Sequence, residues 1–155
     1  MKIGEEIPNF EAQTQENKII SKKDILGQYC VLFFYPKDQS PICTLEACSF
    51  RDNHNEFAKY NCKIIGISAD SVESHKKFVE KYNLNFPLIS DKGDRLKKLF
   101  GVKNDMFGLM SGRETYLVDP QGKIIFIFNS QLNANSHIIK TIEILKKEIQ
   151  KKEKN

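Results

Sequence analysis

Two cysteines lie five residues apart where an apolar run gives way to a helical pattern, in the segment FFYPKDQSPICTLEACSFRD. Cys43 follows a loop that contains Pro36, Ser40 and Pro41, and Cys48 lies further along the predicted helix. A thiol in the first turn of a helix lies beside unpaired N–H groups and the positive end of the helix dipole, which favour thiolate over thiol. The Ser40 hydroxyl can turn toward the sulfur or toward a substrate oxygen. The pattern therefore indicates an activated cysteine nucleophile.

The spacing of Cys43 and Cys48 does not allow a disulfide on an intact helix. Residues five apart are separated by about 140° around a helix axis, so the two side chains diverge. A disulfide requires Cα atoms about 4.4–6.8 Å apart with Cβ vectors aimed at each other. If the two thiols react together, the first turns of the helix must unwind, which helix ends do at low cost.

Metal binding and plain packing are the other roles open to the cysteines. Cys43, Cys48 and His54 would form a zinc site, but their spacing matches no short zinc knuckle and they do not converge on one helix face. No CxxC motif of a thiol–disulfide carrier is present. Cys30 and Cys62 lie in apolar strand-like runs, so core packing is expected for both. Neither a metal nor a cofactor is expected.

Alternating strand and helix patterns surround these cysteines and must position them. The predicted strands are residues 29–35, 62–68, 86–89, 115–118 and 123–128, the last two forming a hairpin around the turn DPQG. The predicted helices are residues 44–60, a helix through Tyr82 that either Asp70 or Ser71 could cap, residues 93–100, and a last helix with Ile138, Ile142, Leu145 and Ile149 on one stripe. This order predicts an α/β fold with a central sheet covered by helices on both faces. Because ligands bind such sheets at the carboxyl ends of strands, the loop from Tyr35 to Cys43 is the expected site.

Composition and charge restrict the partners. The 155 residues are 40% hydrophobic and 28% charged, which predicts one globular domain at residues 1–150 and a charged tail at residues 151–155. Much of the net charge of +4 lies at the C-terminus, where Lys and Glu alternate, so no nucleic-acid partner is expected. No apolar run approaches the roughly 20 residues that span a bilayer, and no secretory signal is visible. We therefore expect a cytoplasmic, thiol-reducing location without a membrane partner.

The cysteine segment closely resembles the active-site segment of the peroxiredoxins, and within them the Q type, also called bacterioferritin comigratory protein. The family pattern Pro-x-x-x-Thr/Ser-x-x-Cys reads Pro36, Ser40 and Cys43 here, and the second cysteine of the Q type is Cys48. The segment GRETYLVDPQGKII matches the stretch that carries the family arginine, here Arg113. The resemblance covers most of the chain and implies a thioredoxin-like fold of the peroxiredoxin type, with a central mixed β-sheet flanked by helices.

The resemblance also implies an activity. It implies a thiol-dependent peroxidase in which Cys43 becomes a sulfenic acid, condenses with Cys48 and is recycled by thioredoxin or a similar dithiol, in a monomer or weak dimer. Arg113, Ser40 and backbone N–H groups would stabilise the transition state. Glu46, one turn after Cys43, either orients an active-site arginine or is a surface carboxylate. A non-enzymatic redox sensor or chaperone on the same fold is the alternative.

Two positions depart from the family pattern. Ser40 stands where Thr is more usual, which keeps the hydroxyl but loses the methyl group that restricts its rotamer. Ile42 stands where the Q type often has Gly. A β-branched residue does not adopt a positive φ at low cost, so we expect ordinary backbone geometry there.

Overall fold

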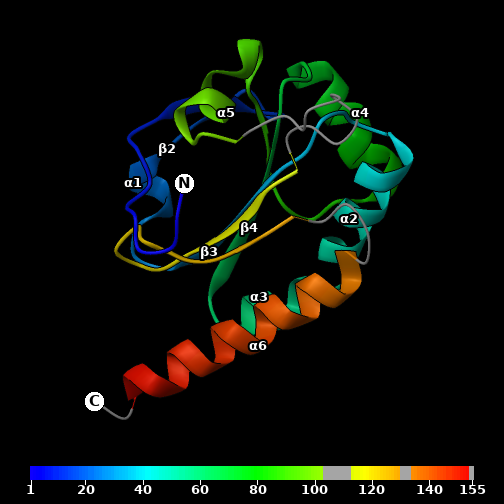
Figure 1. Cartoon of the computed structure of the whole chain (residues 1–155). Helices are drawn as coiled ribbons and strands as arrows, with labels where there is room; N and C mark the ends of the chain where they lie inside the picture. The colour runs from blue at the N-terminus through cyan, green and yellow to red at the C-terminus, as the bar shows by residue number, and fades with distance from the viewer. Residues whose placement is uncertain (103–112, 130–133, 154–155) are drawn as a thin grey trace.

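A seven-stranded mixed sheet forms the centre of the part of the chain that the structure describes, residues 1–102, 113–129 and 134–153 (Figure 1). The structure is a computed structural model. The strands are β1 (Glu11–Thr14), β2 (Ile19–Ser21), β3 (Tyr29–Phe34), β4 (Cys62–Ser68), β5 (Leu88–Ser90), β6 (Thr115–Val118) and β7 (Ile124–Phe128). Their order is β2-β1-β5-β4-β3-β6-β7; β3 pairs with β4 and β4 with β5 in parallel, and the other pairs are antiparallel. The predicted mixed sheet is confirmed.

Helices cover both faces of the sheet, as predicted. One face packs against α2 (Pro41–Asp52), α3 (His54–Lys59), α4 (Val72–Tyr82) and the long α6 (Ala134–Glu153) (Figure 1). The opposite face packs against α1 (Lys22–Ile25) and α5 (Arg95–Leu99), which follows a single 3₁₀ turn, η1 (Lys92–Asp94). Every residue of β3 is buried, as its continuous apolar run predicts, because alternate side chains enter the two cores.

The helix predicted at residues 44–60 is wrong as a single element. It begins earlier, at Pro41, because Ser40 is its N-cap residue and proline fits the first helical turn. It ends at Asp52, and α3 starts anew after Asn53, whose backbone leaves the helical region (φ −100°, ψ 8°). The Asn53 side chain donates to the Ser49 carbonyl (2.8 Å), so it competes with the backbone for that acceptor.

Other differences concern short elements. Neither β1, β2 nor α1 is predicted from the sequence, because each has only three or four residues and shows no clear apolar period. Strand pairing stabilises β1, which lies between β2 and β5. The strand predicted at residues 86–89 lies at Leu88–Ser90. The helix predicted at residues 93–100 is regular only from Arg95, because Gly93 and Asp94 both have positive φ (76° and 58°).

The sheet order brings three segments to one edge. β3 and β4 are parallel, so both carboxyl ends point to this edge, where the chain turns into α2 and α4. β6 runs antiparallel beside β3, with Thr115 opposite Phe33, and the Phe34 N–H donates to the Glu114 carbonyl (2.8 Å). The residue just before Glu114 therefore lies where β3 ends and the predicted site begins.

The final helix continues into the predicted tail, because α6 runs through Glu153. Its predicted apolar stripe is confirmed: Ile138 and Leu145 are buried, and Ile142 and Ile149 pack against the same core. The boundary between a domain at residues 1–150 and a tail stays a prediction. Within the described residues, no helix combines the length and the apolar character needed to cross a membrane.

Candidate active site

Cys43 is the third residue of α2, and its side chain is only 1% exposed. The first backbone hydrogen bond of the helix runs from the Thr44 N–H to the Ser40 carbonyl (2.9 Å). The N–H groups of Ile42 and Cys43 precede this bond and have no acceptor among the described residues. The turn that carries the sulfur thus holds two backbone donors at the positive end of the α2 dipole.

Arg113 reaches the sulfur from a distant part of the chain. Its Nη2 donates to Cys43 Sγ at 3.1 Å, across 70 residues of sequence. The side chain is buried (6% exposed) and Nη1 has no partner among the described residues. The position follows from the strand order, because Arg113 precedes β6 and β6 begins beside the end of β3. One guanidinium therefore contacts the sulfur and has a second donor available at the same place.

The loop before α2 places Pro36 and Ser40 differently. Pro36 is exposed, and Ser40 is half-buried. The Ser40 hydroxyl donates to the Lys37 carbonyl (3.0 Å), so its single proton is used inside the loop rather than on the sulfur. Ile42 has ordinary backbone geometry, as predicted, whereas Gln39 takes the left-handed conformation (φ 61°).

All four cysteines are free thiols. Cys48 is half-buried on α2, and the unbroken helix from Pro41 to Asp52 keeps it on a different side from Cys43. Partial burial raises the pKa of Cys48. Cys30 and Cys62 are buried in the two cores, as predicted, and burial raises the pKa of Cys62 to about 12 and that of Cys30 well above its ordinary value. Neither core cysteine is therefore a nucleophile at neutral pH.

Glu46 is a buried carboxyl group rather than a surface one. It is 0% exposed, and neither carboxyl oxygen has a hydrogen-bond partner among the described residues. Burial raises the pKa of Glu46 from 4.5 to about 8, although the charge of Arg113 opposes the shift. Glu46 lies one helical turn beyond Cys43, and the charge of Arg113 lowers its pKa, so it belongs to the same buried site.

The raised pKa of Glu46 predicts that the free energy of unfolding falls as the pH rises. Because its pKa is about 8 in the folded protein and near 4.5 when unfolded, the folded state retains a proton that the unfolded state releases. The protonated Glu46 contributes fully to the free energy of unfolding below pH 4.5. Between pH 4.5 and pH 8 this contribution falls by at most about 1.4 kcal/mol per pH unit, and above pH 8 it is lost. We expect Glu46→Gln to gain stability over the parent protein across this window, measured by urea unfolding of the reduced proteins.

The exposed Glu56→Gln on α3 is the matched control, and we expect its unfolding free energy to follow the parent at every pH. Parallel pH profiles for Glu46→Gln and the parent would show that Glu46 is not the titrating group.

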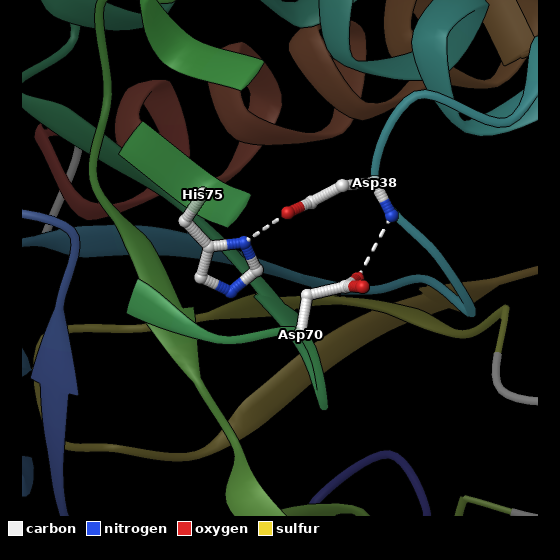
Figure 2. A group of neighbouring side chains, drawn as sticks. All are labelled: Asp38, Asp70 and His75. Carbon is white, nitrogen blue, oxygen red and sulfur yellow. Dashed lines mark hydrogen bonds and ion pairs between the residues drawn. The ribbon is translucent and has the colours of Figure 1, made fainter. Parts of the chain in front are cut away.

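A second group of polar side chains, missed in the sequence, lies at the same edge of the sheet (Figure 2). Asp38 follows β3, Asp70 follows β4, and His75 lies on α4. Their placement after adjacent parallel strands is the signal that could have revealed them. Their ligand atoms lie within 4.8 Å of one another, as in a cation site, and each of the three residues already takes part in a hydrogen bond. The zinc ligands considered from the sequence are not grouped in this way among the described residues.

Comparisons with known proteins agree with this fold and indicate its family. Residues 3–127 match the sequence model of the AhpC/TSA family. The chain is 42% identical to the chloroplastic peroxiredoxin Q of Triticum aestivum over 138 residues, which are 89% of this chain and 64% of that protein. It is also 42% identical to the chloroplastic peroxiredoxin Q of Sedum lineare, over 92% of this chain and 76% of the relative. The chain thus spans just under two thirds of the wheat protein.

Solved structures give the same result. The chain superimposes on the peroxidoxin BcpB of Mycobacterium tuberculosis with a TM-score of 0.85 and 35% identity, covering 94% of this chain and 97% of that one. A structure of Xanthomonas campestris peroxiredoxin Q matches with a TM-score of 0.80 and 31% identity, covering 90% and 91% of the two chains. The predicted thioredoxin-like fold of the peroxiredoxin type is confirmed. The chain therefore belongs to the AhpC/TSA family, in its peroxiredoxin Q branch.

Proposed function

We propose that this chain is a thiol-dependent peroxidase that reduces hydrogen peroxide and organic hydroperoxides. The observation that carries the proposal is the 3.1 Å contact from Arg113 Nη2 to the buried Cys43 Sγ in the first turn of α2. Membership of the peroxiredoxin Q branch supports it. Organic hydroperoxides are included because a related protein, the bacterioferritin comigratory protein of Xanthomonas campestris, is described as reducing alkyl peroxides.

In the first step, the Cys43 thiolate attacks the terminal peroxide oxygen. A sulfur–oxygen bond forms while the oxygen–oxygen bond breaks, and the leaving oxygen takes a proton to depart as water or an alcohol. Sulfur is oxidised to a sulfenic acid and the peroxide is reduced by two electrons. Ordinary thiol ionisation contributes little to the rate, because a free cysteine is already roughly 3% thiolate at pH 7 and full ionisation gains about thirtyfold.

Most of the acceleration must therefore come from donors that stabilise charge on the two peroxide oxygens. Arg113 is suited to this role, since it stays charged and its Nη1 is a second donor beside the one on the sulfur. The N–H groups of Ile42 and Cys43 add two donors in the same turn. Ser40 joins them only if its hydroxyl rotates away from Lys37. Pro36 stiffens the loop that carries Ser40.

The second step joins Cys43 and Cys48. The Cys48 sulfur attacks the sulfenic sulfur, a disulfide forms, and the hydroxyl group leaves as water. Because α2 holds the two side chains apart, residues 43–48 must lose their helical structure in this step. An external dithiol, thioredoxin or a similar protein, then restores both thiols by exchange: it donates two electrons and two protons and leaves as a disulfide.

The remaining expectations about partners belong to the same proposal. We propose a monomer or weak dimer in the cytoplasm, where reducing conditions keep the cysteines free, with no nucleic-acid or membrane partner. The plant relatives are described as chloroplastic, which is a statement about those proteins.

The proposal is tested by stoichiometry. With thioredoxin and its reductase supplied, we expect one chain to consume many equivalents of peroxide. A redox sensor or a chaperone on the same fold would consume about one equivalent and then stop. Consumption that ends near one equivalent, with the reductant shown to be active on a known peroxiredoxin, would contradict the peroxidase assignment.

Cys48→Ser separates the two chemical steps. We expect the variant to form the Cys43 sulfenic acid at the parent rate, because Cys48 does not contact the buried sulfur, and to lose thioredoxin-linked turnover by at least about tenfold, since no intramolecular disulfide forms. Sulfenic acid trapping and coupled turnover measure the two effects. Cys30→Ala, a change at a core cysteine, is the matched control and is expected to retain both activities. Unchanged turnover in Cys48→Ser would exclude Cys48 as the resolving residue.

A further inference from the structure

Asp38 attaches the loop that leads to Cys43 to the rest of the fold. This loop, residues 35–40, joins β3 to α2, and within it Tyr35 and Asp38 are buried (3% and 6% exposed). The Asp38 carboxylate faces His75 of α4, with Oδ2 2.7 Å from Nδ1, and the Asp38 N–H donates to Asp70 Oδ2 at 2.8 Å (Figure 2). The contacts join the loop to the end of β4 and to α4.

The Asp38 carboxylate accepts two further hydrogen bonds. Tyr35 donates its hydroxyl to Oδ1 (2.6 Å), and Ser74 donates its hydroxyl to Oδ2 (2.8 Å). Burial raises the pKa of Tyr35 well above its ordinary value, and the nearby Asp38 charge adds to this effect, so the phenol remains a donor. Three donors directed at one buried carboxyl group are the arrangement that an anion requires away from water.

His75 lies against the Asp38 carboxyl group in the protein interior. It is 0% exposed, and its Nε2 lies 2.9 Å from the carbonyl oxygen of Ile89, which can only accept. Its Nδ1 faces the Asp38 carboxylate, and the Tyr35 hydroxyl, already committed to Asp38, lies 3.5 Å away. The ring nitrogens thus lie within hydrogen-bond distance of a carboxylate oxygen on one side and a backbone carbonyl on the other. Asp38 and His75 have the geometry of a buried salt bridge, with Nδ1 2.7 Å from Oδ2.

The backbone next to this pair is held in an unfavourable conformation. Gln39 follows Asp38 and has a φ of 61°, a region that costs energy for a residue with a side chain. Ser40, the N-cap residue of α2, comes next. The bonds of Asp38 thus hold the strained residue that sets the direction in which the chain enters the helix of Cys43.

We propose that Asp38 and His75 form a buried ion pair, and that the contact between them positions the loop and the first turn of α2 for reaction with peroxide and thereby controls how readily that turn unwinds for disulfide formation. The inference rests on the proposed peroxidase function. Asp38 and His75 are positioning residues in this proposal, since they act through the loop and not on the substrate.

Breaking the contact between Asp38 and His75, as opposed to removing its charge alone, should affect the two chemical steps in opposite directions. Oxidation needs the folded turn, in which Cys43, Arg113 and the backbone donors are together, so it becomes slower. Condensation with Cys48 needs the unwound turn, so it becomes faster. The sulfenic acid then has a shorter lifetime, and excess peroxide converts less of it to sulfinic acid. A general loss of stability has no reason to produce this opposite pair of changes.

The central test compares His75→Leu with Asp38→Asn. His75→Leu leaves the Asp38 carboxylate without its cation, and we expect about tenfold slower oxidation of Cys43, several-fold faster condensation and less sulfinic acid. Asp38→Asn keeps a neutral contact, because its amide donates to Nδ1 while Nε2 still donates to Ile89, so we expect rates within about threefold of the parent. Rapid quenching with mass spectrometry of sulfenic acid, disulfide and sulfinic acid measures all three quantities.

Two further variants separate the proposal from a folding defect. Ser74→Ala removes one hydrogen bond to Asp38 from the half-buried first turn of α4, and we expect a smaller shift, about two- to threefold, in the same opposite directions. Asp91→Asn is the matched control: Asp91 is buried at the same edge, but its carboxylate accepts from the N–H groups of Leu96 and Lys97 rather than holding the loop. It should lower stability without changing the ratio of the two rates.

The nitrogen chemical shifts of His75 give a second readout. With ¹⁵N-labelled histidine, we expect two protonated ring nitrogens in the parent and one in Asp38→Asn, and a neutral ring in the parent would overturn the ion pair. Unchanged rates in both His75→Leu and Ser74→Ala, or an equal fall in oxidation and condensation, would overturn the control of unwinding. A parent protein whose Cys43 does not react with peroxide would overturn the proposed function, whereas a reactive parent with unaffected variants would overturn this inference alone.

Discussion

Cys43→Ser abolishes peroxide turnover if the proposed mechanism is correct, with a loss of at least about a thousandfold in coupled activity. A serine hydroxyl is almost completely protonated at neutral pH, and oxygen cannot form the sulfenic acid on which the later steps depend. The side chain changes by one buried atom, so the fold and the loop from Pro36 to Ser40 should be retained. Peroxide consumption with thioredoxin and its reductase measures the effect.

The comparison with other cysteine variants makes this result specific. Cys48→Ser should still consume one equivalent of peroxide, whereas Cys43→Ser should consume none. Cys62→Ala, at a buried cysteine whose pKa burial raises to about 12, should behave as the parent. Substantial turnover in Cys43→Ser would mean that another group performs the reaction and would remove the basis of the proposed function.

Arg113→Met is expected to slow the oxidation of Cys43 by about 100-fold or more, which is the usual effect of removing a donor that stabilises transition-state charge. The reason is local: the variant loses both the 3.1 Å contact with the sulfur and the adjacent Nη1 donor. Arg113→Lys should recover only part of the rate, because an ammonium keeps the charge but not the planar pair of donors. The second-order rate constant for sulfenic acid formation is the quantity to measure.

Arg113→Met is compared with a control variant at an exposed arginine, and it should also change the pKa of Glu46. Arg95→Met, an exposed position at the start of α5, should leave the oxidation rate unchanged. In Arg113→Met, the pKa of Glu46 should rise further, because Arg113 is the charge that opposes the effect of burial. The pH window in which the unfolding free energy falls should then extend upward. An oxidation rate equal to the parent rate would exclude Arg113 from the reaction.

Features that depend on neighbouring residues could be predicted from the sequence. The apolar run of β3, the cap of α4 and the hairpin of β6 and β7 all appear in the structure, because each depends on side-chain pattern or turn chemistry within a few residues. The cap is Ser71, one of the two candidates that the sequence left open. The same holds for Cys43 at the start of a helix and for its spacing from Cys48. The break at Asn53 was missed because a helical pattern on both sides concealed a single competing side chain.

The contacts between distant segments could only be decided by the tertiary structure. The sequence, through its resemblance to a family, pointed to Arg113, but its contact with Cys43 exists because β6 lies antiparallel beside β3. In the same way, Asp38 meets His75 only because β3 and β4 are parallel neighbours whose ends direct a loop and a helix to one place. The burial of Glu46 also depends on packing around α2. Local patterns report backbone preference, whereas these pairings depend on the order of strands in the sheet, which no short stretch of sequence encodes.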